Sequence, residues 1–152
     1  MRRAIEIRRR QGQGVIDRVS LSYAERVIAR QVLTVGRGER FLVESPEAVR
    51  VHDGDAFLLD DDRLVAVDAA VEPLDEVRGG DFYHLTRLAW QLGARGVPVQ
   101  IEPFRLLVPR EPSIERMLKA AGASLTPVRE SFRPEGDDDA SPLCDWHLAP
   151  RG

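Results

Sequence analysis

Apolar and polar residues alternate in short segments along the first half of the chain, a pattern typical of half-buried strands. We expect strands at residues 25–35, 40–44, 48–51, 56–59 and 64–71. The connections between them are short and contain Gly-Arg-Gly-Glu, Asp-Gly and Asp-Asp-Asp-Arg, sequences that favour tight turns. Four or five short strands at this spacing predict a small β sandwich or barrel.

The pattern changes after residues 72–73, where apolar residues begin to recur at helical spacing. The expected elements are a strand at 74–78, a helix at 81–93, strands at 97–101 and 105–108, a helix at 111–122 and a strand at 123–128. The order strand, helix, strand, strand, helix, strand is that of a ferredoxin-like βαββαβ unit. The predicted fold class is therefore α+β, with an all-β domain followed by a ferredoxin-like domain.

Residues at the expected helix ends support these boundaries. Asp81 is suited to cap the start of the first helix, and Gly93 is the expected stop, in the left-handed conformation that lets the last carbonyls find partners. Pro112 suits the first turn of the second helix, and Gly122 suits its end.

The domain boundaries follow from these patterns. We expect an N-terminal β domain at 1–73, a ferredoxin-like domain at 74–130 and a tail at 131–152. The tail is rich in proline, glycine and aspartate and has no apolar periodicity, so it is expected to be flexible and acidic.

Composition narrows the class of protein. The chain is 43% hydrophobic and 31% charged, which fits globular domains and excludes general disorder. A single cysteine excludes an internal disulfide framework, and no apolar run approaches the roughly 18 residues that suggest a membrane span. Because the start also lacks the apolar core and cleavage site of a secretory signal, we expect a soluble cytoplasmic protein that does not bind membranes.

Five arginines within the first ten residues allow two interpretations. Clustered cations gain affinity for nucleic acid by releasing phosphate counterions. Alternatively, Ile5 and Ile7 alternate with Glu6 as in a strand, and basic side chains discourage edge-to-edge pairing. We favour a charged edge strand and no nucleic-acid partner, because no aromatic residues are interleaved for base stacking.

Catalytic motifs are absent from the sequence, which has no G-x-S-x-G elbow, no H-E-x-x-H and no P-loop, so we do not expect an enzyme. The chain has three histidines. His52 is most simply a turn residue, and His84 lies in the first turns of the first helix, near Asp81. His147 follows Cys144 by three residues, a spacing that can bring a thiolate and an imidazole to one metal ion.

One C-x-x-H pair supplies only half of a four-ligand site. Two copies of the tail in a dimer would supply two thiolates and two imidazoles, a set that suits Ni(II), Zn(II) or Cu(II). The alternative is a solvated tail in which Cys144 and His147 lie near each other by chance. The acidic triplet at 137–139 is also best explained as solvated tail, because a flexible triplet loses entropy when it chelates an ion.

Taken together, these segments resemble the UreE family of urease accessory proteins, which are nickel metallochaperones. The resemblance is carried by residues 53–78, 88–101, 114–122 and 131–136. The middle segment, "LAWQLGARGVPVQI", fits the family pattern at Ala89, Leu92, Gly93, Arg95, Pro98 and Gln100. The resemblance implies an N-terminal domain of the peptide-binding kind and a C-terminal metal-binding domain through which two protomers form a homodimer. It also implies transfer of Ni(II) to the urease assembly complex, which includes the GTPase UreG.

The sequence departs from the family at its main metal ligand. The histidine that follows Asn-Arg in the family is Gly96 here, and glycine has no side-chain donor. Two hypotheses follow from the resemblance. In the first, the protein is a nickel chaperone whose ligands are Cys144 and His147, with His84 as a further candidate. In the second, it is an adaptor in urease assembly that binds metal weakly or not at all.

A homodimer would need an apolar contact surface on the C-terminal domain. Trp90 and Phe104 are candidate anchors of such an interface, although both side chains also suit a domain core.

Overall fold

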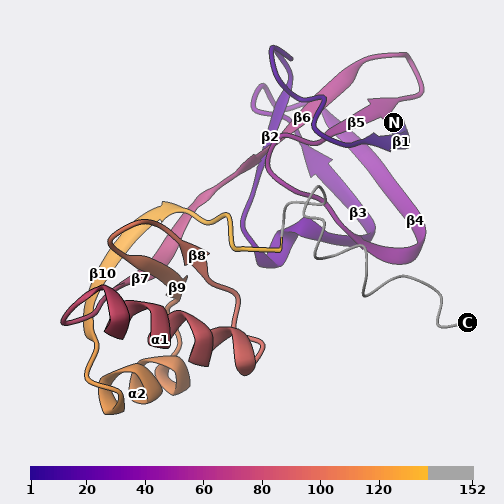
Figure 1. Cartoon of the computed structure of the whole chain (residues 1–152). Coiled ribbons are helices and arrows are strands. Elements are labelled where there is room, and N and C mark those ends of the chain that lie inside the picture. The colour runs from indigo at the N-terminus through magenta and orange to yellow at the C-terminus, as the bar shows by residue number, and fades with distance from the viewer. Residues whose placement is uncertain (137–152) are drawn as a thin grey trace, which may run out of the picture. The chain divides into compact units, whose positions relative to one another are not determined.

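The computed structural model describes residues 1–136 and separates into two units, with the boundary between Glu72 and Pro73 (Figure 1). The first unit is all β, and the second combines two helices with a sheet, so the predicted α+β class is confirmed. Within the described residues, neither helix has the length and apolar character needed to cross a membrane.

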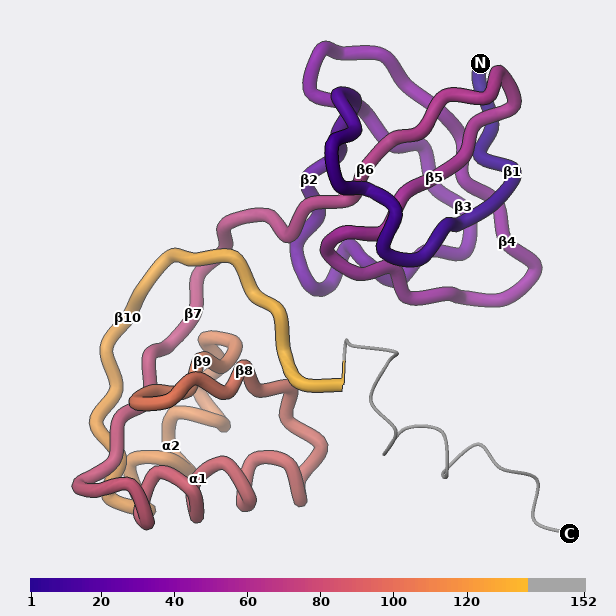
Figure 2. The backbone as a smooth tube through the Cα atoms, turned by 45° about the horizontal axis from the view of Figure 1, so that its top comes forward, coloured from indigo at the N-terminus to yellow at the C-terminus, as the bar shows by residue number. Residues whose placement is uncertain are grey.

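The N-terminal unit contains six strands rather than the four or five expected. They are β1 (Arg2–Arg8), β2 (Arg18–Leu21), β3 (Val27–Thr34), β4 (Arg40–Arg50), β5 (Ala56–Leu59) and β6 (Leu64–Ala69). A short 3₁₀ helix, Ala24–Arg26, precedes β3. The strand order is β2-β6-β5-β1-β4-β3, and all six strands contribute apolar side chains to one core. The sheet must therefore curve around that core, as the backbone trace in Figure 2 shows.

The arginine-rich first strand is not at an edge, so that expectation was wrong. β1 pairs in parallel with β4 and antiparallel with β5, which places it inside the sheet. Ala4 and Ile7 pack against the core, while Arg2 and Arg9 form ion pairs with Asp61 and Asp55. The apolar side chains make β1 an interior strand, and its arginines are accommodated by acidic neighbours.

The C-terminal unit has the predicted ferredoxin-like order. Its elements are β7 (Val71–Arg78), α1 (Phe82–Ala94), β8 (Gln100–Ile101), β9 (Leu106–Pro109), α2 (Pro112–Ala120) and β10 (Ser124–Ser131). The strands are ordered β10-β7-β9-β8, and both helices pack on one face of the sheet (Figures 1 and 2). The core between these layers includes Val77 and Val108 from the sheet, Leu88 and Leu92 from α1, and Leu118 from α2.

The end of α1 differs from the prediction. Asp81 caps its start as expected, accepting the His84 amide at 2.7 Å. The helix continues through Gly93, however, and the left-handed residue is Gly96, with φ of +71°. The Gly96 amide donates to the Gly93 carbonyl and the Val97 amide donates to the Leu92 carbonyl, the two bonds of a Schellman motif. A glycine inside a helix costs only about 1 kcal/mol, so Gly93 alone did not end it.

Residues 131–136 belong to the folded domain, so the predicted tail begins too early. The Arg133 amide donates to Gln100 Oε1 at 2.8 Å, and the Glu135 amide donates to the Val99 carbonyl at 2.7 Å. Phe132 is fully buried. These bonds hold the segment after β10 against β8. Cys144 and His147 lie outside the described residues.

Candidate functional site

The loop that follows α1 presents Gly96 at the surface of the C-terminal unit. This is the position where the resemblance implies a metal-binding histidine. A Cβ atom built on Gly96 would meet no other atom of the described chain within 4 Å, beyond its sequence neighbours. A side chain here would therefore project into open space. The energetic cost of a substitution comes from the positive φ, which residues other than glycine rarely adopt.

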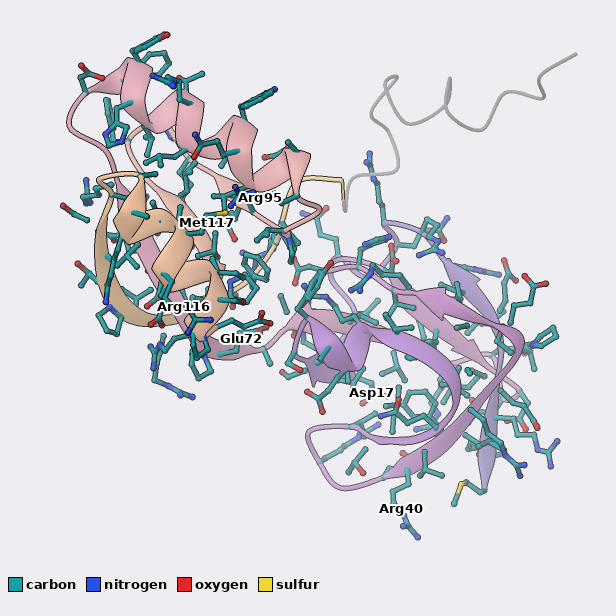
Figure 3. The ribbon with its side chains drawn as sticks, turned by 90° about the horizontal axis from the view of Figure 1, so that it is seen from below. Asp17, Arg40, Glu72, Arg95, Arg116 and Met117 are labelled. Atoms are coloured by element: carbon teal, nitrogen blue, oxygen red, sulfur yellow. The ribbon has the colours of Figure 1, made fainter. Side chains whose placement is uncertain are left out.

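A groove of about 570 Å³ lies beside this loop, between α1 and α2. Figure 3 shows Arg95, at the end of α1, close to Met117 of α2. The groove is lined by Trp90, Gln91, Ala94, Arg95, Met117, Ala120 and Ala121. The Trp90 side chain is 72% exposed, so it is not a core residue. Tryptophan, methionine and arginine are residue types enriched at protein interfaces, and here Trp90, Met117 and Arg95 line one exposed groove.

Helical spacing alone predicts that Met117 shares the buried face of α2 with Ile114 and Leu118. The structure buries Ile114 and Leu118, whereas Met117 is only half-buried and reaches the groove. Helical periodicity could not separate these roles, because Met117 lies between the core face and the solvent face of the same helix.

His84 joins the start of α1 to the end of α2. The Gly80 amide donates to Nδ1 at 2.9 Å, so the ring proton is on Nε2, which lies 2.8 Å from the Ala121 carbonyl oxygen and donates to it. The ring also lies against Gly122, where an added Cβ would be 3.6 Å from Cε1. Both nitrogens are therefore engaged, and a metal ion at His84 would have to displace one of these bonds.

Metal-ligating side chains do not converge within residues 1–136, where no group of three or more histidine, cysteine, aspartate or glutamate residues could hold an ion. Of the expected ligands, only His84 is described. Its position at the start of α1 does not bring it to the Gly96 loop, which follows the other end of the same helix.

A second exposed aromatic surface lies at the start of α1. Phe82 and Phe104 are 75% and 80% exposed, and with Leu85 and Pro103 they line a groove of about 340 Å³. Phe104 is thus also a surface residue and remains a candidate anchor. The two surfaces lie toward opposite ends of α1.

Arg105 fixes the loop that carries Phe104. Its guanidinium donates to Glu76 at 2.9 Å, to Glu102 at 3.2 Å and to Glu130 at 2.7 Å, which ties the loop to β7 and β10. The hydrogen bond from Arg105 holds the pKa of Glu130 below its usual range. Bonds from Arg78 and Arg105 do the same for the pKa of Glu76. The cluster stabilises the sheet, because the Arg105 guanidinium links carboxylates of β7, β10 and the loop between β8 and β9.

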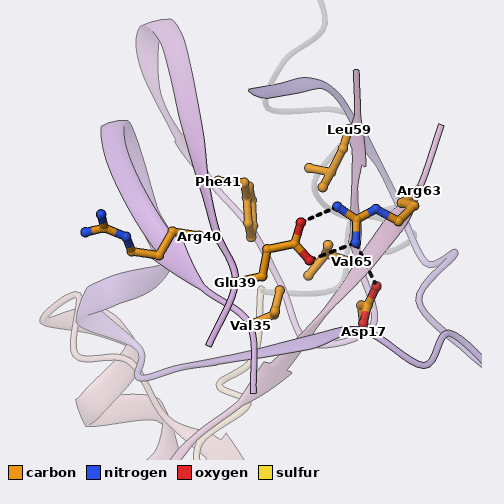
Figure 4. A pocket seen from close by; sticks show the side chains of 8 residues that line it. All are labelled: Asp17, Val35, Glu39, Arg40, Phe41, Leu59, Arg63 and Val65. Atoms are coloured by element: carbon orange, nitrogen blue, oxygen red, sulfur yellow. Dashed lines mark hydrogen bonds and ion pairs between the residues drawn. The ribbon is translucent and has the colours of Figure 1, made fainter. Parts of the chain in front are cut away.

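A small cavity in the N-terminal unit has no functional character. Figure 4 shows its charged border, where Arg63 donates to Glu39 and approaches Asp17 at 3.9 Å. Its interior is apolar and holds about 10 Å³, which is at the lower limit for a single water molecule. The ion pairs lie at the border of this cavity, which is too small for a ligand.

Comparison with known proteins places both units in one family. The N-terminal domain model of the UreE urease accessory protein matches residues 2–70, and the C-terminal domain model matches residues 72–147. The chain is 47% identical to the urease accessory protein UreE of Ruegeria pomeroyi over 120 residues, which cover 79% of this chain and 78% of that protein.

Two further relatives agree. The chain is 42% identical to UreE of Rhodobacter capsulatus, with 80% of this chain and 76% of that protein covered. It is also 42% identical to UreE of Bradyrhizobium sp. (strain ORS 278) over 86% of this chain, although it spans only 62% of the length of that protein. The chain therefore belongs to the UreE family of urease accessory proteins.

Proposed function

We propose that this protein binds Ni(II) as a homodimer and delivers it to the urease maturation complex, including the GTPase UreG, in the cytoplasm. Membership of the UreE family supports this proposal, and the relatives are named urease accessory proteins. The role is that of a chaperone rather than an enzyme, in keeping with the absence of a catalytic motif from the sequence. Nickel is the cargo, so its site must both bind and release it.

The ligands that we propose are Cys144 and His147 of each protomer. Gly96 has no donor atom, and both nitrogens of His84 are engaged with backbone groups, so His84 is the weaker candidate. A thiolate and an imidazole are good ligands for Ni(II), and for Zn(II) or Cu(II) in vitro. Two protomers would together supply four donors.

We further propose that the protomers meet through the groove that contains Trp90. A two-fold axis through this surface would place the two Gly96 loops near each other, because the groove includes Arg95. It would also bury the exposed indole, and buried tryptophan is a frequent anchor of interfaces.

The alternative is an adaptor that binds urease assembly proteins and little or no metal. Two observations favour it. Gly96 stands where the resemblance implies a metal-binding histidine, and residues 1–136 contain no cluster of three metal-ligating side chains. The exposed aromatic groove at Phe82 and Phe104 would then be a contact surface for those proteins.

Equilibrium dialysis with Ni(II) separates the two functions. The samples are the full chain, the Cys144→Ala/His147→Ala variant, a chain truncated after Gly136, and Ser141→Ala as a control within the same tail. The truncation keeps residues 131–136, which are bonded to β8. The chaperone proposal requires tight binding by the full chain and Ser141→Ala. Absence of binding by the full chain would leave the adaptor, and binding that survives truncation would exclude the tail ligands.

A further inference from the structure

Asp75 is a buried acid in the C-terminal unit, with only 2% of its surface exposed. It lies on β7, two residues before Val77, and alternate residues of a strand share a face. Val77 packs against α1 and α2, so Asp75 lies on the helix-covered face of the sheet. Its neighbour in the ladder is Val108 on β9, which belongs to the same apolar core. An ionised carboxylate in such surroundings is costly unless it is paired.

The cations near Asp75 do not satisfy it. Arg110 Nε is 3.8 Å from Oδ1, beyond hydrogen-bond distance. The Arg110 guanidinium instead donates to the carbonyls of Leu74, at 3.2 Å, and Val128, at 2.9 Å. Oδ2 of Asp75 is buried, and no N–H or O–H group of the described residues donates a hydrogen bond to it. Buried polar atoms of this kind call for a physical explanation.

A second acid faces Asp75 from α2. Glu115 is half-buried and interacts with the Asp75 carboxyl, while Lys119 contributes a weaker attraction from one turn further along the same helix. Two adjacent carboxyls in a desolvated place share a proton more readily than they ionise together. A proton on Asp75 would give its Oδ2 a donor to direct at Glu115, which accounts for the missing partner.

We propose that the Asp75 carboxyl retains its proton and donates a hydrogen bond to the Glu115 carboxylate, and that this carboxyl pair holds α2 on the sheet until rising pH removes the proton. Burial raises the pKa of Asp75, and the hydrogen bond and negative charge of Glu115 raise this pKa further. The opposing charges of Arg110 and Lys119 are smaller influences on the same pKa.

The sign of the effect follows from proton linkage. Because the pKa of Asp75 is raised in the folded state, its contribution is complete below the pKa of an unfolded aspartate, about 3.9, and is lost as pH rises through the folded value. Loss of the proton would leave two facing carboxylates and loosen α2. The helix supplies Met117, Ala120 and Ala121 to the groove, so pH would control that surface. This inference does not depend on nickel binding.

Carboxyl ¹³C NMR of the full chain tests the proton directly. The Asp75 carboxyl should titrate above the value of about 3.9 for a free aspartate. In Glu115→Gln, the Asp75 midpoint should fall, because both the acceptor charge and the repulsion are removed. A midpoint at the ordinary value, or one unchanged in Glu115→Gln, would overturn the shared proton.

Amide hydrogen exchange tests the release of α2. Protection factors of α2 amides in the wild type should decrease as pH rises from about 3.9 through the Asp75 midpoint found by NMR, by about tenfold for each pH unit that separates the two values. Asp75→Asn should remove this dependence, whereas Glu111→Gln, an exposed acid at the start of the same helix, should retain it. Equal pH dependence in the wild type and Asp75→Asn would refute the proposal that the Asp75–Glu115 pair holds α2 on the sheet.

Discussion

Substitution of Gly96 by histidine tests both the helix end and the proposal that a metal-binding histidine belongs at this position. The residue has φ of +71°, and a left-handed conformation costs a side-chain-bearing residue about 1–2 kcal/mol. Replacing glycine also removes freedom from the unfolded chain, which returns about 0.4–1 kcal/mol. No steric term is added, because an added Cβ meets no other described atom within 4 Å, beyond its sequence neighbours. The free energy of unfolding should therefore fall by roughly 0–1.6 kcal/mol, with a central value of about 0.8 kcal/mol.

The matched control is Gly96→Ala, which has the same backbone strain and no donor atom. Both variants should lose similar stability in urea, as measured by circular dichroism. Only Gly96→His should bind Ni(II) more tightly in equilibrium dialysis, by at least tenfold, which corresponds to about 1.4 kcal/mol. The gain should depend on protein concentration, because one imidazole comes from each protomer.

Two results would refute this reasoning. Stabilisation by Gly96→Ala would mean that Gly96 does not adopt the left-handed conformation of the Schellman motif. Equal Ni(II) affinity in both variants would mean that two such loops do not meet across a dimer axis.

Three further predictions follow from the contacts described above. His84→Ala removes the hydrogen bond from the Gly80 amide and the one that joins α1 to the Ala121 carbonyl at the end of α2. It should therefore lower the free energy of unfolding by about 1–3 kcal/mol and leave Ni(II) affinity unchanged; reduced affinity of the fully folded variant would identify His84 as a ligand. If the protein forms the proposed dimer, Trp90→Glu should convert it to a monomer in size-exclusion chromatography with light scattering, and Phe104→Glu is the control that decides which aromatic anchors the proposed interface. Arg105→Gln should reduce the loss of stability that the wild type shows when the pH is lowered. The lowered pKa of Glu130 gives stability that is present above the unfolded pKa of about 4.3 and is lost as pH falls through the folded value. An unchanged dependence of the free energy of unfolding on acidic pH would contradict the role of this cluster.

The sequence by itself determined the order of elements in the C-terminal unit. The change of apolar spacing at residues 72–73, the Asp81 cap and the Gly122 helix end are local signals, because each depends on residues a few positions apart. The same applies to the expected strands at 25–35, 56–59 and 64–71 of the N-terminal unit, whereas those expected at 40–44 and 48–51 form the single strand β4, and β2 was not expected. These signals, with the segment that contains Gly96, were sufficient to indicate the family.

Long-range contacts decided the remaining features. Whether β1 is an edge or an interior strand depends on its partners β4 and β5, and alternation along one strand does not carry that information. Residues 131–136 are folded because Gln100 and Val99 bind them, although their composition resembles that of a tail.

The candidate site was predicted only where its residues lie close together in the sequence. The sequence located the Gly96 loop, because the resemblance at this position is carried by one continuous segment. It did not predict the contact of His84 with Ala121 or that of Asp75 with Glu115. These partners are 37 and 40 residues apart along the chain, and only packing brings them together. Local hydrogen bonding and periodicity are encoded in short segments, whereas burial and the proton carried by a buried acid are properties of the assembled core.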